Sequence, residues 1–160
     1  MRLGHFHIPG AATRREYAVY IMVARHCRTE KICFYIGKTG DNRKGCNPVI
    51  SRAGNHFSFN KIHSQMRNQL PSDPENYDFD FFYTTFGKYI DPSESRSGVN
   101  LINEMEKVLN RLAQKAFGGK VLNPYNGKVT SREKDLAIPE RITQLEELVK
   151  EVKKFVGEVI

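Results

Sequence analysis

The feature that most constrains the fold is a pair of short apolar runs near the N-terminus, separated by a polar segment. Tyr17 to Ala24 is YAVYIMVA, and Ile32 to Gly37 is ICFYIG. Both runs are rich in β-branched and aromatic residues, and His26 to Lys31 (HCRTEK) between them is short enough for a connecting loop. The two runs therefore predict a β-hairpin. Because the first run is mostly apolar, we expect its strand to be the buried, central one.

The middle of the chain predicts two helical segments and a third strand. Asn47-Pro48 is typical of a helix start, with Asn47 as the N-cap and Pro48 in the first turn of a helix over 49–55. A second helical stretch is expected over 60–69, ended by the prolines of the sequence PSDP. From Tyr77 to Phe86 the sequence YDFDFFYTTF alternates aromatic and acidic residues at its start, which is the pattern of a half-exposed strand.

Two longer amphipathic segments follow. Between Val99 and Phe117, apolar residues recur at helical spacing, and Gly118-Gly119 ends the helix. From Pro139 to Ile160, apolar side chains at alternating spacings of three and four form a heptad seam. This last helix either docks on its own domain or mediates a homodimer, and the pattern fits both alternatives.

Together these elements predict an α+β fold, with a small central antiparallel three-stranded sheet flanked by helices and an added C-terminal amphipathic helix. We expect residues 1–129 to form one domain with an N-terminal arm, and residues 130–160 to form the C-terminal helix that packs or dimerises. A length of 160 residues suits a single compact unit.

Composition excludes several classes of protein. With 39% hydrophobic residues the chain can bury a core, which excludes intrinsic disorder. It has no run of about 18 apolar residues, so we expect no membrane span, and its first residues lack the apolar stretch of a signal peptide. The cysteines Cys27, Cys33 and Cys46 match no CxxC metal site. They are typical of reduced thiols, and we expect a cytoplasmic protein.

The positive charge is concentrated in the first part of the chain. The net charge is +7, but residues 1–70 carry 12 Lys and Arg against 3 Asp and Glu, while the rest of the chain is slightly acidic. A basic surface on a near-neutral remainder is the electrostatic pattern of a protein that binds a phosphate backbone. The alternative is a basic face that serves only solubility.

Polar residues that could take part in catalysis follow the predicted elements in order. Ala18-Val19-Tyr20 lies on the first strand, and Tyr35-Ile36-Gly37-Lys38-Thr39 ends the second. Arg52 and His56 stand four apart, on one face of the helix that starts after Asn47-Pro48. Glu106 lies in the long helix, and Asn123 follows it.

This ordered set resembles the GIY-YIG nucleases. In that family two strands end in the tripeptides GIY and YIG, followed by an arginine on a helix, a glutamate on a later helix and an asparagine. Here the tripeptides are AVY, with Ala18 in place of the glycine, and an unaltered YIG. The resemblance covers about Tyr17 to Asn123 and implies the GIY-YIG fold and a metal-dependent DNA endonuclease. The chain departs from the pattern in its long basic loop after Gly37 and in the wide spacing from Glu106 to Asn123.

The resemblance implies a role for each polar residue near the reacting atoms. Phosphodiester hydrolysis needs an activated water, a cationic clamp for the transition state and usually a divalent cation. Tyr20 would be the general base, helped by Lys38 or a metal-bound hydroxide, because a phenol with a pKa near 10 is a weak base. Tyr35 would orient the phosphate or the water. His56 would contact or protonate the leaving oxygen.

Charged residues would complete the site that the resemblance implies. Arg52 offers a permanently charged fork to phosphate oxygens. Glu106 would hold one Mg²⁺ or Mn²⁺ ion, since hard cations prefer carboxylate oxygens. We prefer it to Glu104, because the apolar stripe places Glu106 on the inward edge of the helix and Glu104 elsewhere. Gly37 and Asn123 would be structural.

Contact with double-stranded DNA is expected from the basic segment. The residues that we expect at the DNA backbone are Lys38, Arg43, Lys44, Arg52, Lys61 and Arg67. The lack of a separate DNA-reading domain, and a histidine four residues after Arg52, favour a restriction-type enzyme within the family.

Other interpretations of the same residues remain. A structure-specific repair or mobile-element nuclease is one alternative, and a catalytically silent DNA-binding module with the same fold is another. Tyrosines on an apolar strand are often only core residues. The presence of Tyr20, Tyr35, Arg52 and Glu106 together argues against a silent module, which has no physical need for all four.

Overall fold

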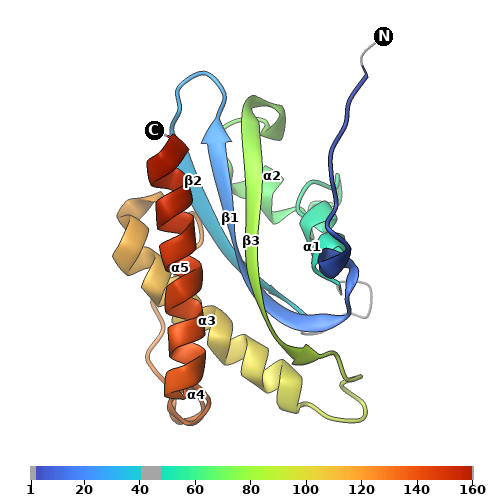
Figure 1. The fold of residues 1–160 in the computed structure, drawn as a ribbon, viewed down its shortest axis with the longest axis vertical. Coiled ribbons are helices and arrows are strands. Elements are labelled where there is room, and N and C mark those ends of the chain that lie inside the picture. Colours follow the sequence, from blue (N-terminus) through green and yellow to red (C-terminus); the bar gives the residue numbers. More distant parts are fainter. Residues whose placement is uncertain (1–2, 41–47, 160) are drawn as a thin grey trace.

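The computed structural model describes residues 3–40 and 48–159 and shows an α+β fold (Figure 1). An antiparallel sheet of three strands lies at its centre, with helices on both faces. The predicted fold class is therefore confirmed at this level. The elements in chain order are η1 (Gly10–Thr13), β1 (Glu16–His26), β2 (Ile32–Thr39), α1 (Val49–Asn55), α2 (Gln65–Gln69), η3 (Pro74–Asn76), β3 (Tyr77–Lys88), α3 (Ser97–Phe117), η4 (Gly118–Lys120), α4 (Ser131–Leu136) and α5 (Pro139–Val159).

The strand order is β2-β1-β3, so the first apolar run forms the central strand, as predicted. β1 and β2 form the expected hairpin, in which Tyr20 pairs with Gly37 and Met22 pairs with Tyr35. On its other side β1 pairs with β3, where Tyr83 lies opposite Tyr20. The mainly apolar sequence of β1 suits a strand that is covered on both faces and paired on both edges.

Alternation along the strands divides the interior into two cores. On one face, Val19, Ile21 and Ile36 pack beneath α3 and α5. On the other face, Tyr20, Met22 and Tyr35 form a smaller cluster with Met66 of α2. Figure 1 shows the corresponding layers, with α3 and α5 on one side of the sheet and α1 and α2 on the other.

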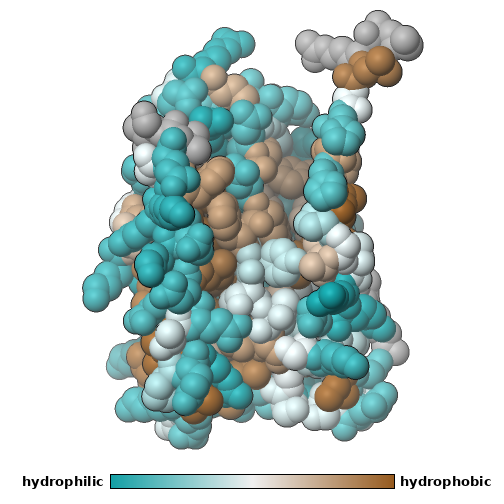
Figure 2. All heavy atoms as spheres, viewed as in Figure 1, coloured by the Kyte–Doolittle hydropathy of each residue, from teal (hydrophilic) through white to brown (hydrophobic). Residues whose placement is uncertain are grey.

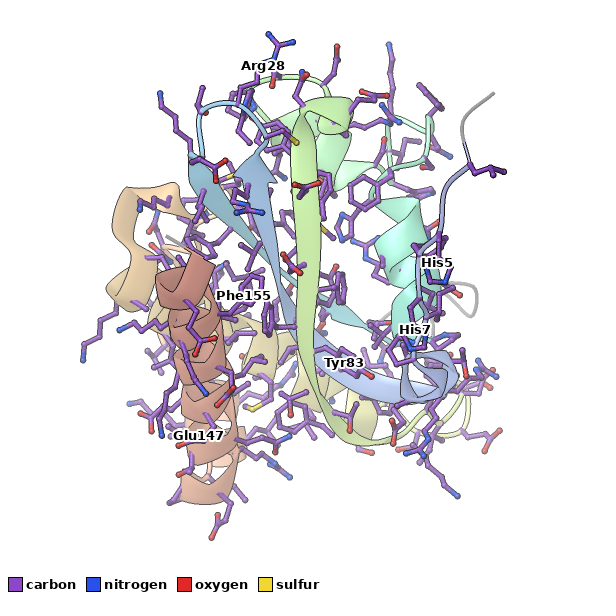
Figure 3. The ribbon with its side chains drawn as sticks, turned by 45° about the horizontal axis from the view of Figure 1, so that its top comes forward. His5, His7, Arg28, Tyr83, Glu147 and Phe155 are labelled. Carbon is purple, nitrogen blue, oxygen red and sulfur yellow. The ribbon has the colours of Figure 1, made fainter. Side chains whose placement is uncertain are left out.

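The seam of the C-terminal helix is buried within its own chain. Leu145 and Val152 are fully buried in the core that they share with α3, and Phe155 packs against Phe82 of β3 with ring centroids 5.2 Å apart. Figure 3 shows Phe155 between α5 and the sheet. The helix docks on its own domain, and the homodimer stays a prediction.

The connection between α1 and β3 differs most from the prediction. We expected a helix over 60–69, but α2 includes only Gln65–Gln69, and turns precede it. Asn60 explains the difference, because its side-chain oxygen accepts a hydrogen bond from the Ile62 amide at 3.0 Å and its carbonyl accepts from His63 and Ser64. A local turn of this kind competes with a helix.

The ends of two helices also differ from prediction. Pro48 is the residue before α1, in its N-cap position with extended backbone, and not part of the first turn. Asn47, which we predicted as the cap, lies outside the described residues. The segment before α5 forms the separate helix α4, where the Thr130 side chain accepts from the Glu133 amide at 3.1 Å. A Thr-x-x-Glu sequence of this kind is typical of a helix start.

No helix in the described part of the chain is long and apolar enough to cross a membrane. Figure 2 shows hydrophilic residues along α5 and a hydrophobic strip over β3, between α5 and the N-terminal arm. The arm carries His5 and His7 and runs alongside α1 (Figures 1 and 3).

Candidate active site

The site is built around the close approach of Tyr20 to Gly37. These residues are cross-strand partners in the hairpin, and both are buried. A Cβ atom at position 37 would lie closer than 3.0 Å to the Tyr20 ring and hydroxyl. Only glycine therefore leaves room for the tyrosine on this face of the sheet. The structural role expected for Gly37 has a physical basis in this contact.

The rings of Tyr20, Tyr35 and His56 form a compact buried cluster. The Tyr20 hydroxyl lies 2.6 Å from His56 Nε2, at hydrogen-bond distance. The His56 ring meets the Tyr35 ring edge-on at 4.8 Å, and Phe81 of β3 stacks on Tyr20 at 4.4 Å. Tyr20 and His56 are fully buried. The contribution of Phe81 could not be predicted from local sequence, because it depends on the register between β1 and β3.

Burial holds the two members of this hydrogen bond in their neutral forms. Desolvation raises the pKa of Tyr20 well above its usual range, and raises the pKa of Tyr35 to about 12. Desolvation, with the nearby charge of Arg52, lowers the pKa of His56 to about 3. A neutral imidazole has one nitrogen that can accept a proton. His56 Nε2 can therefore accept the Tyr20 hydroxyl proton, and Nδ1 has no hydrogen-bond partner among the described residues.

Arg52 adds the positive charge of the cluster. It lies in the last turn of α1, one turn before His56, so one helix end presents both side chains. Its charge and a side-chain hydrogen bond oppose the desolvation of both tyrosines, which moves the pKa of Tyr20 and of Tyr35 downward. Arg52 thus stabilises the phenolate form of Tyr20, although burial has the larger effect.

Lys38 and Glu106 form an ion pair beside this cluster. The Lys38 ammonium contacts the Glu106 carboxylate, and the two side chains are 20% and 26% exposed. By strand alternation, Lys38 lies on the α3 face of the sheet, opposite to Tyr35 and Gly37. β2 is an edge strand, so only one of its sides is paired with another strand of the sheet. The charge of Glu106 still acts on both tyrosines and raises the pKa of each. Glu106 is therefore close enough to act on the tyrosines through its charge. Lys38 contacts Glu106.

The burial of Glu104 in α3 differs from the prediction. We expected Glu106 to face inward and Glu104 to lie elsewhere, but the Glu104 side chain is the more buried, at 4% exposed. It pairs with Lys107 at 2.9 Å, one turn along the same helix. The apolar stripe indicated which side of the helix is buried, but not which of the two carboxylates would face β2.

Asn123 holds β2 from the side. Its amide nitrogen donates to the Ile36 carbonyl at 2.6 Å, and its side-chain oxygen accepts from the Ile36 amide at 3.0 Å. Asn110 of α3 in turn donates to the Asn123 carbonyl at 2.8 Å and accepts from the Tyr125 amide at 2.9 Å. Through these two bonds, the Asn123 side chain pairs with the backbone of β2 as a neighbouring strand would. Sequence reasoning missed Asn110, for which the only signal was an asparagine within an amphipathic helix.

The residues around Glu106 are compatible with a hard divalent cation. Glu106 lines a cavity of about 160 Å³ together with Asn110, Asn123 and Tyr125. One carboxylate with a polar, open surrounding suits Mg²⁺ or Mn²⁺, which keep several waters. Across residues 3–40 and 48–159, no group of three or more His, Cys, Asp and Glu could hold a metal ion. Glu106 is the one carboxylate among the described residues that line this cavity, so a cation there stays a prediction.

The expected DNA-binding residues differ in their exposure and contacts. Lys61 is exposed, and Arg52 is half-buried at the cluster. Arg67 is engaged internally, since its Nε donates to the Phe57 carbonyl at 2.8 Å. Arg43 and Lys44 lie outside the described residues.

No protein-family model, curated protein or solved structure matches the chain.

Proposed function

We propose that the protein is a metal-dependent DNA endonuclease of the GIY-YIG type, which hydrolyses phosphodiester bonds of double-stranded DNA. The observation that carries this proposal is the buried contact between the Tyr20 hydroxyl and His56 Nε2, at 2.6 Å. Tyr35, Arg52 and Glu106 act electrostatically on the same tyrosine. A tyrosine placed against a neutral proton acceptor and a guanidinium is arranged to exchange protons.

Tyr20 and His56 would share the work of general base. As Tyr20 takes a proton from the attacking water, its own hydroxyl proton passes to His56 Nε2, so no free phenolate has to form in advance. This arrangement replaces the help from Lys38 that we expected, because Lys38 pairs with Glu106. It also replaces the role expected for His56 at the leaving oxygen, since His56 Nε2 is engaged with the Tyr20 hydroxyl.

Arg52 and Tyr35 would bind and orient the scissile phosphate. Arg52 is the half-buried neighbour of the enclosed tyrosines, and the phosphate and the water would approach from its side. Its forked guanidinium suits two phosphate oxygens and the charge that develops on them. Binding of the phosphate would neutralise the guanidinium charge next to His56, which makes His56 a better proton acceptor.

Glu106 would hold the divalent cation. When bound, the cation would act as a Lewis acid that stabilises negative charge on the phosphate and the leaving oxygen. Lys38, now paired with Glu106, would then share the carboxylate or turn toward the DNA backbone.

The proposal is tested by incubating the purified chain with plasmid and with oligonucleotide duplexes in Mg²⁺ or Mn²⁺, and again with EDTA. Tyr20→Phe removes only the hydroxyl and is expected to slow cleavage by roughly 10²- to 10⁴-fold. Tyr83→Phe is the matched control, because Tyr83 is the β3 partner of Tyr20 and lies outside the proposed machinery. Glu106→Gln should abolish metal-dependent cleavage, and Glu104→Gln should not.

Two results would contradict the proposal. If the wild type binds DNA but cuts no substrate in either metal, the chain is a DNA-binding module and not a nuclease. If Tyr83→Phe impairs cleavage as strongly as Tyr20→Phe, the assignment of the general base is wrong.

A further inference from the structure

The turn that connects α1 to α2 exposes two large apolar side chains. Phe59 is 85% exposed and Ile62 is 73% exposed, in a segment that otherwise carries polar and basic residues. Exposure of a phenylalanine to this degree costs hydrophobic free energy unless a partner covers the ring. The mechanism proposed above uses neither residue.

Hydrogen bonds hold this turn, so the exposure is a feature of a defined conformation. The Asn60 side chain accepts from the Ile62 amide, and its carbonyl accepts from the Ser64 hydroxyl at 2.6 Å. From α2, the Asn68 side chain donates to the Lys61 carbonyl at 2.8 Å, and the Gln65 side chain donates to the Ile62 carbonyl at 3.2 Å. An apolar group presented on such a braced turn loses little conformational freedom on binding.

Arg67 holds the Phe59 ring itself. Its guanidinium carbon lies 4.1 Å from the centroid of the ring, while its Nε donates to the Phe57 carbonyl. This cation–π contact covers one side of the ring and leaves the remainder open. The ring is thus fixed as a flat, exposed platform.

The surroundings favour a polyanion. The sequence contains no acidic residue between Asp41 and Asp73, and Lys61 and His63 flank Ile62 on the turn. Phe59 is three residues after His56, so the two Cα atoms are at most about 11 Å apart. That distance corresponds to about three base-pair steps of DNA. The platform therefore lies close to the place where the proposed function puts the scissile phosphate.

We infer that Phe59, supported by Arg67, is a stacking platform for a nucleobase that has left the helical stack within a few base pairs of the cleavage site. This inference rests on the proposed function and adds to it a substrate feature, which is DNA with a locally unstacked base. Ile62 is the second apolar contact of the same turn. Aromatic side chains stack on any base, and apolar wedges at base steps are a common way to distort DNA.

The chain has no tryptophan, which permits a direct test in the full-length protein. Phe59→Trp introduces a single fluorophore at the platform, and Ile138→Trp introduces one at an exposed site next to α5 as the matched control. Each variant is titrated, in EDTA to prevent cleavage, with a duplex that contains one unpaired base and with the fully paired duplex. We expect the indole emission of the Phe59→Trp variant to be quenched, most strongly by the duplex with the unpaired base. The emission of the Ile138→Trp variant should remain unchanged.

Affinity provides a second measurement. Phe59→Ala is expected to weaken binding of the duplex with the unpaired base by about 5- to 100-fold, the range expected for the loss of one stacked base. Phe6→Ala, a change at an exposed phenylalanine of the N-terminal arm, should have little effect.

The possible failures are distinguishable. If the wild type binds and cleaves DNA, but the Phe59→Trp variant shows no quenching and Phe59→Ala binds normally, only the inference is overturned. If Phe59→Ala changes the oligomeric state and not the affinity for DNA, the platform is a protein contact and the inference is again overturned. If the wild type neither binds nor cleaves DNA, both the inference and the proposed function fail.

Discussion

At the scale of single residues, the contact between Gly37 and Tyr20 leaves no room for a larger side chain at position 37. Gly37→Ala would force its Cβ against the Tyr20 ring, and the fully buried ring cannot move aside easily. We expect a loss of about 1–3 kcal/mol in the free energy of unfolding, the usual cost of overpacking, measured by urea denaturation. Gly157→Ala in α5 is the control, because none of the described atoms lies within 4 Å of a Cβ there. Equal effects of the two changes would contradict the prediction.

The burial of His56 predicts how the free energy of unfolding depends on pH. Burial lowers its pKa to about 3 in the folded chain, from an ordinary value of 6.5. Below pH 6.5 the unfolded chain therefore binds a proton that the folded chain excludes, and stability falls as the pH decreases toward 3. Between pH 6.5 and pH 5, before most carboxylates titrate, His56 should account for a loss of about 2 kcal/mol.

This contribution can be isolated by substitution. His56→Gln cannot take up the proton, so its free energy of unfolding should decrease less than that of the wild type between pH 6.5 and pH 5. His5→Gln, at an exposed position of the N-terminal arm, controls for the removal of a histidine. If His56→Gln and the wild type show the same slope against pH, His56 is not buried in its neutral form.

At the scale of elements, β2 depends on a clamp from outside the sheet. Asn123 makes two hydrogen bonds to Ile36, next to both Tyr35 and Gly37. Asn123→Ala should lower the free energy of unfolding by about 1–3 kcal/mol, because it leaves the part-buried backbone groups of Ile36 without these partners. It should also accelerate hydrogen exchange at the Ile36 amide. Asn126→Ala, at an exposed position three residues later, should do neither. Unchanged exchange at Ile36 would contradict the role of the clamp.

The elements themselves could be predicted where local pattern decides them. β1, β2, β3, α3 and α5 follow from apolar periodicity and agree with prediction to within a few residues. The turn at Asn60 and the helix α4 could not be separated from their neighbours by periodicity, since side-chain hydrogen bonds define them.

The site was predictable to a similar extent and for similar reasons. Motif order selected Tyr20, Tyr35, Arg52 and His56, three of which the structure brings together as interacting rings. The pairing of Tyr20 with His56, and the burial of Glu104, depend on how helices pack on the sheet. Such contacts join residues far apart in the chain, and no local pattern encodes them.

At the scale of the whole molecule, the two faces of the sheet differ in the charge of the elements that cover them. The larger core lies beneath α3 and α5, and the acidic and basic residues of α5 are mixed. The opposite face carries α1 and α2, and residues 48–72, which include both helices, contain no acidic residue (Figure 1). This difference predicts that DNA meets the α1 and α2 face and not the α5 face.

The salt dependence of DNA binding tests this prediction. A lysine that contacts a phosphate releases a counterion, so its removal lowers the slope of log affinity against log salt concentration by about 1. Lys61→Ala, on the exposed turn after α1, should produce this decrease for every DNA sequence tested. Lys153→Ala, at an exposed position of α5, removes the same charge from the other face and should leave the slope unchanged. Fluorescence anisotropy over a range of KCl concentrations measures both slopes. Equal decreases in the two variants would mean that total charge, and not its position on the fold, governs the encounter with DNA.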